Sequence, residues 1–232
     1  MGVFAGPEIV EDGLVLALDA GNTKSYPGSG TTWTDLSGSG NNGDLVNGVG
    51  YSGDNLGSLS FDGVDDYVST NFNPVLNSNR LYTYEIWFKD DSVGGFLSNT
   101  ALISNYGGSA TTPYSRLHIR NNGTLFIGER NTTPTERELS TSFSVVDNTW
   151  KHIVATATSN ELFLYVNGIS IGTSVQRPGG TITSGQNFVI GGNHLGRYQS
   201  CNIAIVRIYL DRALTASEIQ QNFKATRGRF GI

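Results

Sequence analysis

The stretch "ELFLYVNGISIGTS", residues 161–174, is the strongest local indication of the fold. Asn167 and Gly168 separate two runs that are rich in apolar and β-branched residues. An Asn-Gly pair supplies the two positive φ angles that a two-residue type I′ turn requires, so the sequence predicts a β-hairpin here. The first arm, Leu162 to Val166, is almost entirely apolar. Such a strand is typically covered on both faces, which indicates the middle of a two-sheet stack.

Similar runs recur along the rest of the chain. Their spacing of about 8–12 residues is typical of a sandwich of two antiparallel sheets. The 232 residues include 30 glycines and only 6 prolines, and 15% are charged, which favours short strands and tight turns in one all-β domain. Residues 21–55 are rich in Gly, Asn and Ser, and we expect a long ordered loop with room for one short hairpin. The expected strands cover residues 13–20, 57–63, 65–70, 82–89, 101–105, 115–120, 124–130, 149–158, 161–168, 169–174, 187–192 and 202–210.

One helix is expected, close to the end of the chain. In "ALTASEIQQNF" (213–223), the Thr215 side chain can accept a hydrogen bond from the backbone of Glu218, whose side chain can reach back to Thr215. Ile219 and Phe223 are one helical turn apart, so they share a face that can dock on the sandwich. The sequence therefore predicts a short C-terminal helix, followed by a basic tail.

Charge and hydropathy exclude several classes of partner. The formal net charge is -5 and no dense run of Lys and Arg is present, so nucleic acid is not expected as a partner. No stretch approaches the roughly 18 consecutive apolar residues of a membrane helix, and residues 1–10 lack the features of a signal peptide. We therefore expect a protein that is neither inserted in a membrane nor exported. Cys201 has no cysteine to pair with and is interpreted as a small buried apolar residue.

Three carboxylates gather in "SLSFDGVDDYVST", residues 58–70. Asp62, Asp65 and Asp66 could bind calcium, divide acid and base roles in a glycosidase, or make a turn. Asp62 and Asp66 are separated by Gly63 and a turn, so they need not share a face of a strand. Asp side chains in turns accept hydrogen bonds from backbone N–H groups that the turn leaves unpaired. We interpret these three carboxylates as part of a turn between two strands.

Four of these stretches, in this order, carry a resemblance to a known family. They are "LSFDGVDDYV" (59–68), "YTYEIWFK" (82–89), "TWKHIVATATSNELFLYVNG" (149–168) and "NIAIVRIYLDRALTASEIQQNF" (202–223). Together they resemble the concanavalin-A-like, laminin-G-type jelly roll, over nearly the whole chain from Gly13. The resemblance implies an all-β, two-sheet antiparallel jelly-roll sandwich that spans residues 13–232.

Both ends of the chain are similar to a narrower group. "GLVLALDAGNTKSYPGSGTTWTDLSGSGNNG" (13–43) and "IQQNFKATRGRFGI" (219–232) resemble versions carried on virion proteins of tailed, especially marine, bacteriophages. This implies a virion component made in the host bacterial cytoplasm, a capsid decoration or fibre subunit, present as a homo-oligomer or in many copies. Residues 1–12 have no place in the jelly roll. We expect them to anchor the domain to other virion proteins, with the basic tail as a second contact.

The family also implies where a metal ion or catalytic acids would lie. Several branches place a calcium-binding Asp in the penultimate strand, where this chain has Ala204, so that site is expected to be absent. A second family site lies on a rim between loops, where Asp65 or Asp66 would serve if calcium bound. The glucanase branch carries its catalytic acids as Glu-x-Asp-x-Glu on one strand, a spacing that this chain lacks. We expect no cofactor and no enzymatic activity.

Host or environmental glycans are candidate ligands, because sugar binding uses aromatic platforms flanked by hydrogen-bonding side chains. The loop "GGNHLGRYQS" (191–200) adds further polar and aromatic groups without regular structure. The candidate residues are Glu85, Trp87, Lys89, His118 and Arg120 on one polar sheet face, and His194, Arg197 and Tyr198 in the loop. The alternative function is that of a free-standing lectin or a glucanase-like protein that acts on glycans.

Overall fold

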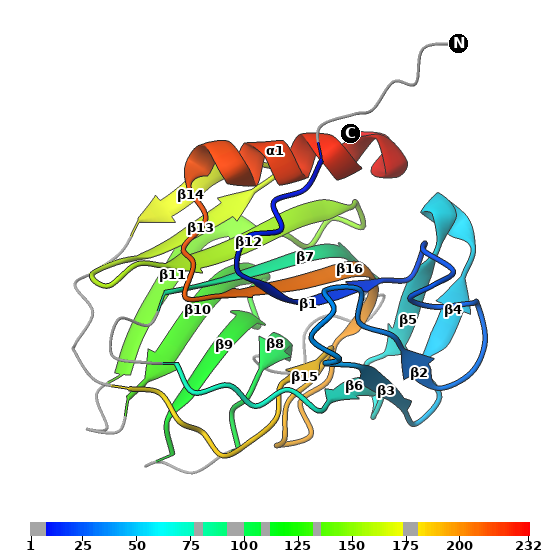
Figure 1. Ribbon diagram of the computed structural model, residues 1–232, viewed down its shortest axis with the longest axis horizontal. Helices are drawn as coiled ribbons and strands as arrows, with labels where there is room; N and C mark the ends of the chain where they lie inside the picture. The colour runs from blue at the N-terminus through cyan, green and yellow to red at the C-terminus, as the bar shows by residue number, and fades with distance from the viewer. Residues whose placement is uncertain (1–7, 77–80, 92–99, 108–111, 132–135, 174–180) are drawn as a thin grey trace.

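The computed structural model describes residues 8–76, 81–91, 100–107, 112–131, 136–173 and 181–232. Within them the chain forms two antiparallel sheets that stack face to face (Figure 1). One helix lies across the outside of the first sheet. The expected two-sheet sandwich with a short C-terminal helix is confirmed.

The first sheet, sheet A, carries the helix. Its strands follow the order β14-β13-β12-β7-β16-β5-β4, and β1 pairs with the second half of the long strand β16. These strands are β1 (Leu14–Asp19), β4 (Gly50–Ser52), β5 (Ser58–Asp62), β7 (Tyr82–Asp90), β12 (Lys151–Ala157), β13 (Leu162–Val166), β14 (Ile169–Thr173) and β16 (Ser200–Leu210).

The second sheet, sheet B, has the order β11-β10-β9-β8-β15-β6-β3-β2. β11 belongs to it although the sequence did not indicate a strand there, and the antiparallel pair β2 and β3 is the short hairpin for which the expected loop 21–55 leaves room. Its strands are β2 (Thr32–Trp33), β3 (Gly43–Val46), β6 (Tyr67–Thr70), β8 (Thr100–Ser104), β9 (Tyr114–Ile119), β10 (Thr124–Arg130), β11 (Glu136–Ser144) and β15 (Val189–Ile190).

The main hydrophobic core lies between the two sheets. Trp33, Tyr84, Phe88 and Phe188 are among its members, and each is 0% exposed. Burying a large apolar side chain contributes about 1.5–3 kcal/mol, so this layer is the main source of stability. Cys201 is buried in the same cluster, and the prediction of a small buried apolar residue is confirmed.

The hairpin predicted at Asn167 and Gly168 joins β13 to β14. Asn167 and Gly168 have φ angles of 50° and 75°, as a type I′ turn requires. Leu164 of β13 packs into the core between the sheets, whereas its neighbour Tyr165 packs against the helix side. The strand is therefore covered on both faces, as the sequence predicts.

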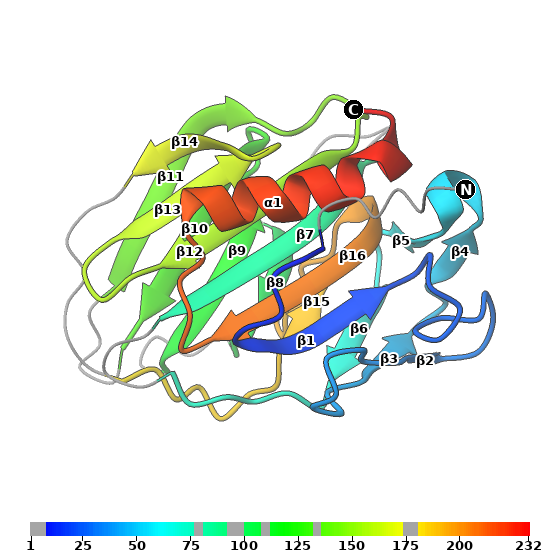
Figure 2. The same cartoon turned by 45° about the horizontal axis from the view of Figure 1, so that its top comes forward.

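Helix α1 (Ala216–Thr226) covers the outer face of sheet A (Figure 2). The predicted capping box is present, because Thr215 accepts a hydrogen bond from the Glu218 backbone and the Glu218 side chain accepts one from Thr215. Ile219 packs against a cluster on sheet A and Phe223 against Trp87. No helix in the described ranges is long and apolar enough to cross a membrane.

The segment expected to anchor the domain is in contact with this helix as far as the structure describes it. The Val10 N–H donates to the side chain of Asn222 at 2.8 Å, and the Tyr209 hydroxyl donates to the Val10 carbonyl at 3.0 Å. Asp12 forms an ion pair with Arg212 at 3.0 Å. Residues 8–12 therefore pack on the sandwich, while residues 1–7 lie outside the described ranges.

Candidate functional site

The outer face of sheet B has no helix over it in the described part of the chain, because α1 lies on sheet A (Figures 1 and 2). Side chains alternate along β9 and β10, and Leu117 and Ile127 point into the core. The residues next to them in these strands point away from the core. We define the sheet-B face by the following residues: Tyr106, Tyr114, Arg116, His118, Arg120, Phe126, Gly128 and Glu138.

Arg116 organises the aromatic side chains of this face. Its guanidinium carbon lies 4.5 Å from the ring centroid of Tyr114, 4.8 Å from that of Tyr106 and 5.3 Å from that of Phe126. Arg120 lies 4.8 Å from the same phenylalanine ring. Guanidinium groups within about 6 Å of a ring are held there by cation–π attraction, so these rings and cations form one preorganised cluster, in which Tyr114 and Phe126 are buried and Tyr106 is partly exposed.

His118 lies at the centre of this surface and is 1% exposed. Neither of its ring nitrogens has a hydrogen-bond partner among the residues that the structure describes. Burial, followed by the positive charges of Arg116, Arg197 and Arg120, lowers the pKa of His118 well below its usual range. The ring is therefore neutral near pH 7, with one nitrogen able to donate and the other able to accept.

Glu138, from the neighbouring strand β11, partly balances these cations. Its carboxylate lies 3.6 Å from Arg116 and 3.4 Å from Arg120. Both arginines and the glutamate are partly exposed, so each pair contributes at most about 1 kcal/mol. The pairs hold the two guanidinium groups in place beside His118.

The loop 191–200 borders the sheet-B face. The Gly191 N–H donates to the Leu102 carbonyl of β8 at 3.1 Å. Leu102 follows Ala101, which pairs with His118 in the sheet. Asn193 accepts hydrogen bonds from the backbone of Leu195 and Arg197, which fixes the loop. The loop thus brings the Arg197 charge close enough to affect His118.

The other two loop candidates have partners within the domain. His194 forms a hydrogen bond with the Asn187 carbonyl at 2.9 Å, and Tyr198 stacks on Tyr67 with ring centroids 5.9 Å apart. Arg197 has no hydrogen bond or ion pair for its guanidinium among the described residues. Of the three predicted loop residues, Arg197 is the one with an unused charge next to the sheet-B face.

The expectation that Glu85 and Trp87 share an open face with His118 is wrong. Trp87 lies on sheet A, is 0% exposed, and stacks on Phe230 with centroids 3.9 Å apart. Its indole N–H donates to Thr226 of α1 at 2.9 Å. Lys89 is on the same sheet, 6.0 Å from the Trp150 ring. The helix and the end of the chain cover this tryptophan, so it offers no surface to a sugar.

Glu85 is also closed in beneath the helix. Its carboxylate, 0% exposed, lies 2.5 Å from Arg207, 2.7 Å from Asn222 and 3.0 Å from His152. Burial alone would raise the pKa of Glu85, but Arg207, His152 and Asn222 outweigh it and bring the pKa to about 2. Glu85 is therefore an ionised structural group that cannot reach a substrate.

The aspartates at 62–66 form the predicted turn. Asp62 accepts hydrogen bonds from the backbone of Val64 at 2.8 Å and Asp65 at 3.4 Å, and Asp66 accepts one from Asp62 at 3.0 Å. Gly63 has a φ angle of 79°, which favours glycine. The interpretation of this acid as turn architecture is confirmed.

The same turn also has the geometry to hold a hard cation. One carboxylate oxygen from each of Asp62, Asp65 and Asp66 lies within 4.8 Å of the others. Asp66 has a buried oxygen with no hydrogen-bond partner within the described ranges, and burial, with the nearby charges of Asp62 and Asp65, raises its pKa. The residues fit calcium, which is bound through oxygen ligands. A calcium ion bound to these three carboxylates would stabilise the turn.

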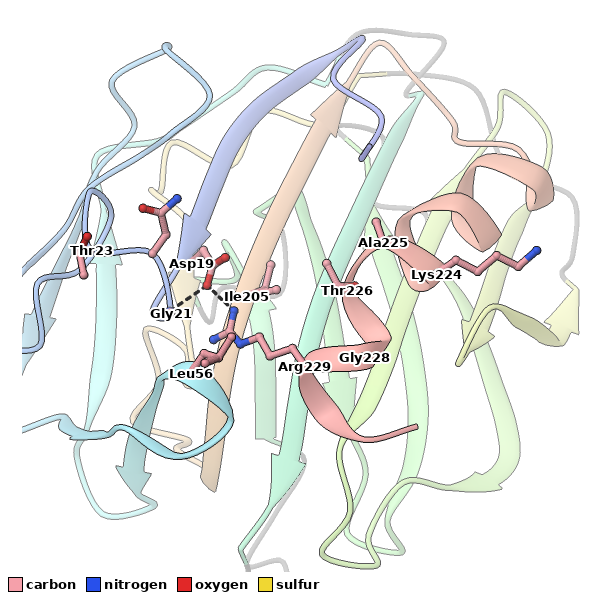
Figure 3. A pocket seen from close by; sticks show the side chains of 11 residues that line it. Asp19, Gly21, Thr23, Leu56, Ile205, Lys224, Ala225, Thr226, Gly228 and Arg229 are labelled. Carbon is pink, nitrogen blue, oxygen red and sulfur yellow. Dashed lines mark hydrogen bonds and ion pairs between the residues drawn. The ribbon is translucent and has the colours of Figure 1, made fainter. Parts of the chain in front are cut away.

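A hollow lies between the turn that follows β1 and the C-terminal end of α1 (Figure 3). It has a volume of about 530 Å³, and Asp19, Lys224 and Arg229 are among its lining residues. The Arg229 guanidinium binds Asp19 at 2.6 Å and donates to the Asn55 carbonyl at 2.6 Å. Part of the predicted basic tail is therefore used to join the C-terminus to the N-terminal half.

Residues 62–220 match the family model described as the concanavalin A-like lectin/glucanases superfamily. The chain belongs to this superfamily. The resemblance on which the jelly-roll expectation rests is confirmed. A search of curated proteins found no significant match.

Solved structures show the same fold at low sequence identity. The binding domain of Paraclostridial mosquitocidal protein 1 has a TM-score of 0.73 and 18% identity, over 92% of this chain and 52% of that one. Domain 4 of AbnA, an arabinanase from Geobacillus stearothermophilus solved with arabinotriose, has a TM-score of 0.71 and 15% identity over 91% and 98%. The ligand binding domain of botulinum neurotoxin serotype D, solved with N-acetylneuraminic acid, has a TM-score of 0.69 and 15% identity over 92% and 51%. This chain therefore spans about half of the toxin domains and nearly all of the arabinanase domain.

Proposed function

We propose that this chain is a non-enzymatic carbohydrate-binding domain whose ligand lies on the sheet-B face. The observation that carries the proposal is the His118 imidazole, which is buried on that face and has no hydrogen-bond partner for either nitrogen in the described part of the chain. A buried polar group without a partner costs about 1–3 kcal/mol. A sugar hydroxyl that reaches a ring nitrogen of His118, once the partly exposed side chains of Arg116 and Arg120 move aside, removes this cost, so a polar ligand can complete this face.

The surrounding groups suit a sugar as well. Tyr106 is partly exposed and packs edge to face on Tyr114, 4.8 Å away, so one aromatic ring remains available beside the guanidinium groups. Two of the structures with this fold, the arabinanase domain and the neurotoxin domain, were solved with a sugar. These likenesses and the polar sheet face support carbohydrate binding as the function.

The absence of enzymatic activity is part of the same proposal. Retaining glycoside hydrolysis needs two carboxyl groups about 5 Å apart, one of them free to act as nucleophile. On the described part of the sheet-B face, Glu138 is paired with two arginines and Glu136 with Arg130. Glu85 is buried in sheet A. These pairings favour a binding role over hydrolysis.

Weak binding at each site is expected. A shallow polar surface gains little from a sugar that water already hydrates well, so a dissociation constant of about 1 mM, or about −4 kcal/mol, is reasonable. Display in many copies would convert later contacts into intramolecular ones and raise the avidity. A binding assay must therefore present the domain multivalently.

More specifically, we propose that the chain is a component of a virion. The two stretches that resemble phage virion proteins, 13–43 and 219–232, meet at the hollow of Figure 3 through the contact between Asp19 and Arg229. A surface built from both ends is suited to contact a neighbouring subunit, as in a capsid decoration or fibre. A particle that incorporates the full chain but not a variant without residues 2–12 would support this role, and equal incorporation would reject it.

Glycan binding is tested by a matched pair of tyrosine variants on a multivalent glycan array. Tyr106→Ala removes the available ring of the sheet-B face, and Tyr51→Ala removes a comparable ring from β4 of sheet A, where it packs 5.4 Å from Tyr26. We expect Tyr106→Ala to weaken binding about tenfold. An aromatic contact contributes about 0.5–1.5 kcal/mol, and a tenfold change in affinity corresponds to about 1.4 kcal/mol. Tyr51→Ala should bind as the parent does. No binding by the parent protein, or equal loss in both variants, contradicts the proposal.

A further inference from the structure

Three buried polar side chains connect the two sheets at the ends of their strands. Thr100 is the first residue of β8 in sheet B, whereas Asp90 ends β7 and Gln199 directly precedes β16 in sheet A. Thr100 and Gln199 are each 2% exposed, and Asp90 is 3% exposed. A hydroxyl, an amide and a carboxyl group therefore meet at a place that is almost closed to water.

The side-chain amide of Gln199 is held by hydrogen bonds at both of its polar atoms. Its Oε1 accepts a hydrogen bond from the Thr100 hydroxyl at 2.5 Å. Its Nε2 donates to Asp90 Oδ1 at 3.3 Å and to the Ser200 carbonyl at 3.1 Å. The Gln199 backbone is also fixed, because its N–H donates to the Gly191 carbonyl at 3.2 Å. The amide therefore has one orientation, with its carbonyl group against the Thr100 hydroxyl.

This contact brings together the parts that an acyl transfer requires. The Thr100 hydroxyl is a nucleophile, the Gln199 Cδ is the acyl carbon, and Asp90 lies against the nitrogen that would leave. Groups fixed against each other in this way react as if present at about 10⁵–10⁸ M. Burial also keeps out the water that would hydrolyse an ester once it had formed.

We propose that Thr100 and Gln199 become joined by an ester bond within the folded chain. The bond between Thr100 Oγ1 and Gln199 Cδ forms, and the bond between Cδ and Nε2 breaks. The hydroxyl proton is transferred to the leaving nitrogen, with Asp90 as the group that passes it on, and ammonia departs. The step needs no oxidant, reductant or further reactant.

The ester would give the sandwich a covalent connection between its sheets. It closes a loop from residue 100 to residue 199, and a cross-link that closes a long loop stabilises a fold mainly by restricting the unfolded chain. Sheet A and sheet B could then not separate fully under heat or mechanical load. This role does not depend on which ligand the domain binds.

The intact mass of the purified full chain tests the proposal directly. Loss of one ammonia should lower the mass by about 17 Da relative to the unlinked chain. Trypsin cleaves after Lys and Arg, so residues 90–116 and 198–207 should appear as one joined species in the digest. A mass equal to that of the unlinked chain, with these two peptides separate, overturns the proposal.

A pair of threonine variants identifies the nucleophile. Thr100→Val keeps the size of the side chain and removes the hydroxyl, so it should have the unlinked mass and no joined peptide. Thr70→Val is the matched control, because it removes a buried hydroxyl that donates to the Phe188 carbonyl at 2.7 Å, and it should remain linked. Asn-Gly pairs such as Asn122-Gly123 can also lose ammonia, by forming a succinimide. A mass loss that persists in Thr100→Val would have that origin and would overturn the ester.

A pair of aspartate variants tests the role of Asp90. A positioned acid or base contributes about 10²–10⁴-fold to a rate, so Asp90→Asn should leave most of the chain unlinked after purification. Asp91→Asn, at the exposed neighbouring position, should be linked as fully as the parent. Equal linked fractions in the two variants would overturn the proton transfer assigned to Asp90.

Discussion

At the scale of single residues, Glu85 is a fully buried charge held by Arg207, Asn222 and His152. We expect Glu85→Gln to lower the free energy of unfolding by about 3–5 kcal/mol, because it leaves the Arg207 guanidinium buried without its counter-charge. Urea unfolding followed by fluorescence measures the change.

A second variant separates the charge from the packing. Glu85→Gln combined with Arg207→Met removes both charges and keeps most of the volume, so much of the lost stability should return. If the double variant is less stable than Glu85→Gln alone, the buried ion pair is not the reason for the loss.

The sequence predicts individual site residues only in part. His118, Arg120 and Arg197 were expected from their chemistry, and the structure places them close enough for both arginine charges to affect the histidine. Trp87 was misassigned because alternation along a strand gives the face on which a side chain lies but not what covers that face. Arg116 was missed because its role depends on Tyr106, which follows a different strand.

At the scale of elements, the capping box of α1 should be measurable in stability. Thr215→Ala removes the side-chain acceptor for the Glu218 backbone N–H, and we expect a loss of about 1 kcal/mol. For a domain of this size, this corresponds to a decrease in Tm of about 2–4 °C. Ser217→Ala, an exposed position in the same helical turn, is the matched control and should leave Tm nearly unchanged. Equal effects in the two variants would contradict the capping role.

The strands that the sequence missed share a physical reason. In β11 most side chains are exposed or half-buried, and Leu139 is its buried apolar residue, so the strand lacks a clear apolar alternation. β2 and β4 have 2 and 3 residues, too few for any periodicity to be seen. Pairing with a neighbouring strand, which no local pattern records, is what makes these segments strands.

The turn at Asp62 allows a test with metal. Asp62 and Asp66 already accept backbone hydrogen bonds, so the turn is closed by the chain itself. We therefore expect EDTA to change Tm little, and added calcium to raise it little. A tightly bound ion would stabilise the fold by its binding free energy. A decrease of several degrees on chelation would assign calcium to Asp62, Asp65 and Asp66.

At the scale of the whole molecule, the docking of α1 on sheet A determines which outer sheet face is available to a ligand. The sequence predicts a sandwich, a terminal helix and the apolar face of that helix, and all three are confirmed. It does not show that the helix docks on sheet A, because Ile219 and Phe223 fit any apolar face of sufficient width. That docking buries Trp87 and leaves the outer face of sheet B, with His118, as the candidate binding surface.

The most direct test of this account is a map of the bound sugar on the isotope-labelled protein by NMR. Titration with the best sugar from the array should shift the backbone amides of residues 114–120, 124–130 and 191–199. Amides of β7 and α1, at 82–90 and 216–226, should stay in place. Shifts concentrated on β7 and α1, with β9 and β10 unchanged, would contradict the assignment of the sheet-B face as the binding surface.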